Sequence, residues 1–202
     1  FQRPYEWKER EWEALWSDLL EQYEKGDDGS STSHFTGAIV TAPVNSVPVG
    51  VSKFLVIDGQ QRLTTVSILL CAIRTYFEKG TKDYNKLTKL LVNEDEDDND
   101  YYKLLPTQLD RDGFKNLIDQ TYSDVDSFSA AYTFFRKKVS GKDSDGLTID
   151  LKRLIDTIQR RITVVAIHLG ESDDPYLIFE SLNAKGAPLT SADLIRNYLL
   201  LR

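Results

Sequence analysis

Residues 53–70 read KFLVIDGQQRLTTVSILL and decide how this chain folds. The run at 53–57 predicts a β-strand, because branched and aromatic side chains favour an extended backbone. Asp58 and Gly59 then form a dipeptide that is typical of tight turns, since glycine accepts backbone angles that other residues avoid. Apolar residues next recur at helical spacing, which predicts a helix running to about Glu78. Its apolar face consists of Leu63, Val66, Leu70, Ile73 and Phe77.

Upstream of this strand, turn and helix, the pattern predicts another helix and another strand. Apolar residues at helical spacing indicate an amphipathic helix over 9–25. Residues 35–41 are rich in apolar and β-branched side chains, which predicts a strand. A loop containing Pro43, Pro48 and Gly50 leads to the strand at 53–57, so the two strands are expected to form a long-looped antiparallel pair.

Residues 81–161 differ in composition from the segments on either side. Charged helical segments dominate this region, which is expected to form a helical insertion into a core of about 1–80 and 162–202. The acidic run at 93–100 and the loop at 140–146 are expected to be exposed. The expected fold is therefore a single α+β domain whose small sheet carries a large helical insertion. The expected helices of the insertion are 83–93, 111–121, 127–139 and 149–161.

The chain returns to the sheet after the insertion. The segment 162–169 is continuous and β-branched, which predicts a buried strand. A helix over 175–182 and a turn at 183–188 are expected to follow. The last helix is expected to open at Thr190, with Asp193 three residues on in the spacing of a capping box.

Composition restricts the class of protein. With 202 residues, of which 41% are hydrophobic and 11% aromatic, the chain is long enough to bury a core. One cysteine and two histidines exclude an intrachain disulfide and a Cys/His zinc cluster. A net charge of −7 argues against duplex binding over the whole surface and leaves room for a local basic site.

The ends of the chain suggest a piece of a longer protein. The sequence has no methionine, begins at Phe1, and closes on residues that are expected to be helical. It contains no apolar run long enough to cross a bilayer and no secretory signal, so a cytoplasmic location is expected.

The turn at Asp58 and the first turn of the following helix carry side chains suited to phosphoryl transfer. A helix N-terminus offers unpaired N–H groups to phosphate, and Arg62 adds a fork of donors. Asp58 can hold a divalent metal such as Mg²⁺ or accept a proton from water. Gln60 and Gln61 carry amides that can orient a water molecule without titrating. Further phosphate-binding positions expected here are Gly59, Thr64 and Thr65.

Local spacing does not by itself separate this site from an ordinary turn. Asp-Gly is among the commonest turn dipeptides, and a polar first helical turn is often only solvated. The segment Ser140-Gly141-Lys142 has only a superficial likeness to a phosphate loop. It is not a Walker A motif, because Arg136 stands at the position of its first glycine and Asp143 follows the lysine.

The N-terminal residues add a second group of candidates. The segment FQRPYEWK alternates aromatic and hydrogen-bonding residues, and Pro4 restricts its backbone. Arg3 can bind phosphate, Gln2 can hydrogen-bond a ligand, and Tyr5 or Trp7 can stack on a base. The alternative is that Tyr5 and Trp7 cover the core beneath the first helix.

A third group lies near the C-terminus. Asn183, Lys185 and Gly186 fall in one predicted turn, where an amide, an ammonium group and free backbone can converge on a ligand; Asp193 and Arg196 follow. The alternative is a plain connection between helices, with glycine in the left-handed position after the first one. Sequence alone leaves both interpretations open.

These three boxes, in this order, resemble the N-terminal domain of the GmrSD family. They are QRPYEW at 2–7, IDGQQRLTT at 57–65 and FESLNAKGAPLTSADLIRN at 179–197, and together they span nearly the whole chain. The family includes modification-dependent restriction enzymes and members that sense phosphorothioate DNA. The resemblance implies a core similar to ParB and sulfiredoxin, in which the box at Asp58 to Arg62 supports nucleotide binding and hydrolysis.

The resemblance also implies a division of labour. In such proteins a separate C-terminal His-Asn-His nuclease domain cuts DNA, and this chain lacks it. The leading hypothesis is an Mg²⁺-dependent NTPase, for example a GTPase, that senses modified DNA and controls the attached nuclease. The alternative is a module that binds nucleotide or modified DNA and acts as a switch without turnover. The preferred nucleotide, the DNA modification and the oligomeric state are left open.

Overall fold

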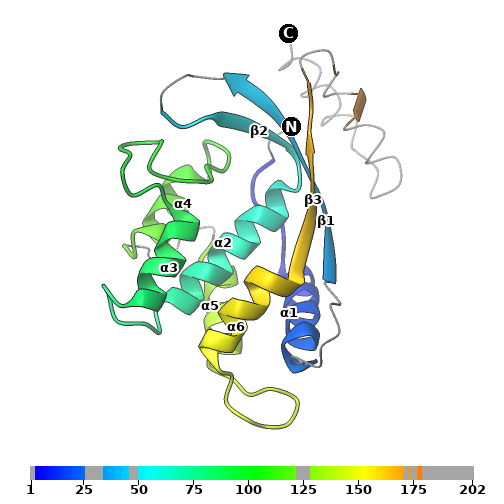
Figure 1. Ribbon diagram of the computed structural model, residues 1–202, viewed down its shortest axis with the longest axis vertical. Helices are drawn as coiled ribbons and strands as arrows, with labels where there is room; N and C mark the ends of the chain where they lie inside the picture. The colour runs from blue at the N-terminus through cyan, green and yellow to red at the C-terminus, as the bar shows by residue number, and fades with distance from the viewer. Residues whose placement is uncertain are drawn as a thin grey trace. The chain divides into compact units, whose positions relative to one another are not determined.

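A computed structural model describes residues 3–25, 34–45, 50–121, 128–170, 173 and 177–178. The described part of the chain is α+β, as expected, with six helices and a small mixed sheet of strand order β2-β1-β3 (Figure 1). In chain order the elements are α1 (Glu9–Glu24), β1 (His34–Asn45), β2 (Lys53–Asp58), α2 (Gln60–Arg74), α3 (Lys82–Leu91), α4 (Arg111–Ile118), α5 (Ser129–Val139), α6 (Leu151–Arg161) and β3 (Ile162–His168).

The chain divides into two compact units. The sheet unit comprises Phe1–Gln2, Gly37–Gln60 and Val165–Arg202, and the helical unit comprises Arg3–Thr36 and Gln61–Val164. The division passes through the middle box, between Gln60 and Gln61. The expected limits of the core and the insertion stay a prediction.

The helical unit is built around one apolar core. The buried stripe predicted for the first helix is confirmed, since Trp12, Trp16 and Leu19 are all less than a tenth exposed. This stripe packs α1 against α5 and α6. The helices predicted between 81 and 161 are also confirmed, and all of them contribute to the core. Its largest fully buried side chains include Phe114, Phe128 and Phe135.

The second helix is shorter than its apolar pattern predicts. It ends at Arg74 rather than near Glu78, and the next N–H groups bond three residues back, from Tyr76 to Ile73 and from Phe77 to Arg74. Bonds of this spacing close tight turns at helix ends. Phe77 still packs against the core, so the apolar face continues after the helix itself has stopped.

The antiparallel pair of β1 and β2 is confirmed, but β1 is longer than expected. Pro43, which was expected in the connecting loop, lies within β1 opposite Phe54. The register shifts between Pro43 and Asn45, as a strand irregularity that accommodates proline. The N–H of Leu169, the residue after β3, donates to the Thr41 oxygen at 2.8 Å, and Pro43 lies two residues further along β1.

The third strand is present, but its predicted burial is wrong. Val164 is 43% exposed and Val165 is 50% exposed. The strand is at the edge of the described sheet, and β-branched residues favour extended backbone whether or not a second layer covers them. No helix among the described residues is long and apolar enough to cross a membrane.

Candidate functional site

Gly59 is required by the way the middle box leaves the sheet. Its φ is +91°, and a Cβ atom placed there would lie 3.1 Å from both the Ala38 oxygen and the Ile39 Cγ1. The glycine therefore combines a left-handed backbone with a close approach to β1. The preceding Asp58 is the last residue of β2, half-buried and in register with Val40.

Gln61 connects the middle box to the N-terminal box. Its Oε1 accepts the backbone N–H of Glu6 at 2.8 Å and that of Trp7 at 3.4 Å, and its Nε2 donates to the Pro4 oxygen at 2.9 Å. One side-chain amide thus serves three backbone groups of an extended segment, in the manner of a neighbouring strand. The first turn of α2 and residues 4–7 are therefore held together by Gln61.

A directed chain of hydrogen bonds continues inward from this point. The Trp12 indole N–H donates to the Tyr5 hydroxyl at 2.8 Å, and the Thr65 hydroxyl donates to the backbone carbonyl oxygen of Gln61 at 2.8 Å. Because the Thr65 proton is used in that bond, the Tyr5 hydroxyl must be the donor in its 2.8 Å contact with Thr65. The order is Trp12 to Tyr5 to Thr65 to Gln61, with every hydroxyl both donating and accepting.

The surroundings of Tyr5 fix it as a neutral phenol. Burial raises the pKa of Tyr5 to about 12. Its backbone N–H donates to Asp110 Oδ2 at 2.8 Å, its ring lies 5.2 Å from that of Phe128, and the Thr107 hydroxyl donates to the same Asp110 oxygen. Sequence reasoning missed Asp110, and no local pattern identifies it, because its partner lies 105 residues away.

Arg62 lines a small pocket in the helical unit. The pocket has a volume of about 240 Å³ and is formed by α1, the start of β1, Arg62 of α2 and the ring of Trp7. His34 Nε2 lies 3.2 Å from Asp18 Oδ2 in its wall. The sequence did not predict this pair of His34 and Asp18. The structure thus places Arg62 beside Trp7 of the N-terminal box; Arg3 and Tyr5 do not line this pocket.

A second carboxylate in this pocket is already engaged. Glu11 accepts the backbone N–H of Lys8 at 3.0 Å, and this bond lowers the pKa of the Glu11 carboxyl. Glu11 therefore caps the beginning of α1, where the positive end of the helix dipole also stabilises a carboxylate. No group of three or more His, Cys, Asp or Glu side chains that can hold a metal occurs within the described ranges.

The other residues that the sequence predicted for the site differ in how deeply they are buried. Thr64 and Thr65 are buried, at 2% and 0% exposure, while Gln60 and Arg3 are half-buried. Among the N-terminal candidates, Gln2 lies outside the described residues. The third box also lies outside them, with Asn183, Lys185, Gly186, Asp193 and Arg196.

Comparison with models of protein families gives a match over nearly the whole chain. A family model described as GmrSD restriction endonuclease, N-terminal domain, matches residues 1–200. No curated protein matches the chain. The match covers all three boxes, so it agrees with the resemblance that those boxes carry.

Proposed function

The chain belongs to the GmrSD restriction endonuclease N-terminal domain family, and from that membership we propose that it binds and hydrolyses a nucleoside triphosphate. Membership makes it a module of a restriction or defence protein. In the proposal, turnover responds to modified DNA and controls a nuclease domain that lies beyond this chain. A ParB/sulfiredoxin-like core is part of the same proposal and rests on the family resemblance.

The observation that carries the proposal is the position of Arg62. It lines a pocket beside Trp7, so a guanidinium group and an aromatic ring from two separate boxes meet in one cavity of the helical unit. A guanidinium binds phosphate oxygens through paired donors, and an aromatic ring stacks on a base. We assign phosphate binding to Arg62 on these grounds.

Asp58 and Gln60 supply the remaining roles, and they precede Arg62 by four and two positions in the chain. Mg²⁺ in such sites is bound by one or two carboxylates together with substrate phosphates, and the single half-buried carboxylate of Asp58 fits that pattern. The ion would neutralise charge on the phosphates. Gln60 orients water, whereas Gln61 positions the N-terminal segment through its amide.

Phosphate release from the four NTPs, measured without DNA, with plain DNA and with phosphorothioate DNA, tests the proposal. Asp58→Ala and Arg62→Ala are expected to reduce turnover at least 100-fold, in the range of a lost charge-stabilising group in phosphoryl transfer. Arg10→Ala is the matched control, because the Arg10 side chain is 93% exposed and bonds its neighbour Glu11. Turnover that survives Asp58→Ala or Arg62→Ala contradicts the proposal.

A second candidate is a nucleotide-binding switch without turnover. The amide of Gln61 favours it, since that group holds the backbone of Pro4 and Glu6 rather than facing a water site. A ligand beside Arg62 and Trp7 would then act by moving the segment that Gln61 holds. Saturable nucleotide binding with no phosphate release, in the presence and absence of DNA, would support the switch.

A further inference from the structure

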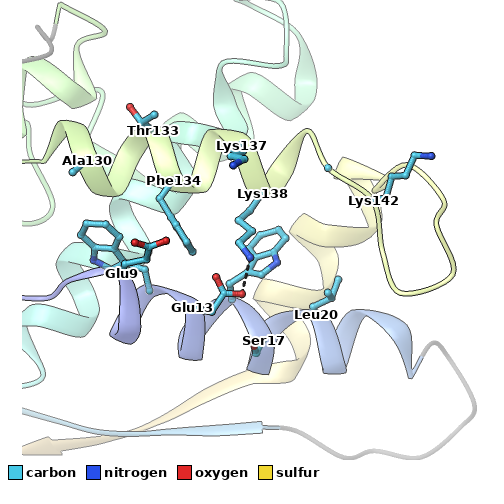
Figure 2. A pocket seen from close by; sticks show the side chains of 13 residues that line it. Glu9, Glu13, Ser17, Leu20, Ala130, Thr133, Phe134, Lys137, Lys138 and Lys142 are labelled. Carbon is cyan, nitrogen blue, oxygen red and sulfur yellow. Dashed lines mark hydrogen bonds and ion pairs between the residues drawn. The ribbon is translucent and has the colours of Figure 1, made fainter.

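A pocket in the helical unit lies away from the middle box, between α1 and α5 (Figure 2). Its volume is about 650 Å³, within the range of ligand pockets in proteins. Its apolar lining comes from Trp12, Trp16, Leu20 and Phe134. We call this pocket the α1/α5 groove.

Charge is distributed unevenly along the α1/α5 groove. Figure 2 shows Glu9 at one end, near Ala130, and Lys142 at the other. At the middle, Lys138 Nζ lies 2.6 Å from Glu13 Oε1 and 5.3 Å from the centre of the Phe134 ring. The charges of Lys138 and Glu13 therefore neutralise each other. The groove therefore has a carboxylate end, a middle with aromatic rings and one neutralised ion pair, and a lysine at the other end.

Lys137 and Lys142 supply the basic charge of the groove, and Figure 2 shows Lys137 beside Lys138 and Lys142 at the far end. They flank the turn after α5, where Gly141 packs so closely that a Cβ atom would lie 3.0 Å from the Lys138 oxygen. Both lysines are exposed. In a chain of net charge −7, two lysines at the mouth of an aromatic-lined cavity are a local basic site of the kind that composition left open.

We propose that the α1/α5 groove is a second nucleotide site, for a nucleotide whose base carries an exocyclic amino group. Lys137 and Lys142 bind the phosphate, the apolar lining covers the base, and Glu9 accepts a hydrogen bond from the amino group. Carboxylates accept such bonds from base amino groups, and lysines bind phosphate as point charges. The nucleotide comes either from solution or from an unpaired position in a DNA strand.

The groove is linked to the middle box by its own lining. Trp12 lines the groove, and its indole N–H opens the chain of bonds through Tyr5 and Thr65 to the Gln61 oxygen. The second site does not depend on hydrolysis at the middle box, since Arg62 is not among the residues that line the groove.

Tryptophan fluorescence provides a direct test. The chain contains three tryptophans, and in a Trp7→Phe background the two that remain, Trp12 and Trp16, both line the groove. Titration of that protein with AMP is expected to give saturable quenching. The double variant Lys137→Gln/Lys142→Gln should weaken AMP binding at least tenfold, as for lost bonds to charged groups. The matched control is Lys86→Gln/Lys89→Gln, which removes two exposed lysines of α3.

Two further ligands test whether the amino group of the base is recognised and whether the nucleotide is free or part of a DNA strand. Purine riboside monophosphate lacks the amino group of AMP, so wild-type Glu9 should favour AMP about tenfold, and Glu9→Gln should reduce that preference. A short single-stranded oligonucleotide that binds more tightly than AMP identifies DNA as the source, and equal binding identifies free nucleotide; either result supports the site.

The proposal is overturned by unchanged AMP binding in Lys137→Gln/Lys142→Gln, by the absence of quenching, or by pyrophosphate binding as tightly as AMP. Circular dichroism checks that each variant is folded. Arg62→Ala should leave groove binding unchanged, so a failure of the proposed hydrolysis and a failure of this site give different results.

Discussion

The side-chain amide of Gln61 accepts the backbone N–H of Glu6 at 2.8 Å, across 55 residues of sequence. Gln61→Ala removes this bond and leaves the N–H of Glu6 and the oxygen of Pro4 without that partner. We expect a loss of roughly 1–2 kcal/mol in the free energy of unfolding. Urea denaturation measures it, with the exposed Gln108→Ala as the matched control.

The same variant separates two roles for Gln61. If the amide positions the N-terminal segment, Gln61→Ala should increase protease cleavage near residues 3–8 in the absence of nucleotide. A glutamine that only orients water would change turnover and leave cleavage and stability as in the wild type.

Tyr5→Phe is expected to destabilise the helical unit by roughly 1–3 kcal/mol, because the Trp12 indole N–H loses its acceptor in a largely buried place. The emission of Trp12 should shift as well. Tyr76→Phe is the control, since that hydroxyl donates to the Arg136 oxygen at the surface. In a double-mutant cycle, Tyr5→Phe and Trp12→Phe should show a coupling energy; strictly additive effects would contradict the bond.

The sequence was sufficient to predict features that depend on neighbouring residues. Periodicity located α1, and the Asp58-Gly59 dipeptide located a turn whose backbone only glycine fits well. It was insufficient where the partner is distant. Asp110 bonds the backbone of Tyr5 from 105 residues away, and no pattern around either residue reports it.

The predicted burial of β3 and the predicted length of β1 were wrong for a related reason. The β-branched run containing Val165 reports a preference for extended backbone, but whether another layer covers that strand is decided by the rest of the fold. Pro43 usually breaks a strand, and the tolerance of β1 for it depends on where its neighbour β3 stops.

Gly59→Ala should destabilise the protein more than Gly80→Ala. The two glycines have nearly the same φ, +91° and +89°, so both variants carry the same backbone strain of roughly 1–3 kcal/mol. Only at Gly59 does the added methyl group also meet Ala38 and Ile39, whereas nothing lies within 4 Å at Gly80. The difference between their free energies of unfolding isolates the contact with β1. Equal losses would show that the contact relaxes at no cost.

Stability should fall at alkaline pH in a defined order. Burial raises the pKa of the Cys71 thiol from 9.0 to about 12 and that of Tyr5 from 10.0 to about 12. Both groups ionise at lower pH in the unfolded chain than in the folded one. The unfolded state therefore binds fewer protons above pH 9, and folding becomes less favourable as the pH rises.

Below pH 9 neither of these two groups makes the free energy of unfolding depend on pH. Between pH 9 and 10 Cys71 alone lowers it as the pH rises, and from pH 10 to about 12 both groups do. Urea unfolding measured at intervals from pH 8 to pH 11.5 should show this break. Cys71→Ala should flatten the first part of the profile and Tyr5→Phe only the second. A profile that both variants leave unchanged would mean that the two groups titrate alike in the folded and unfolded states, and that neither is held neutral by burial.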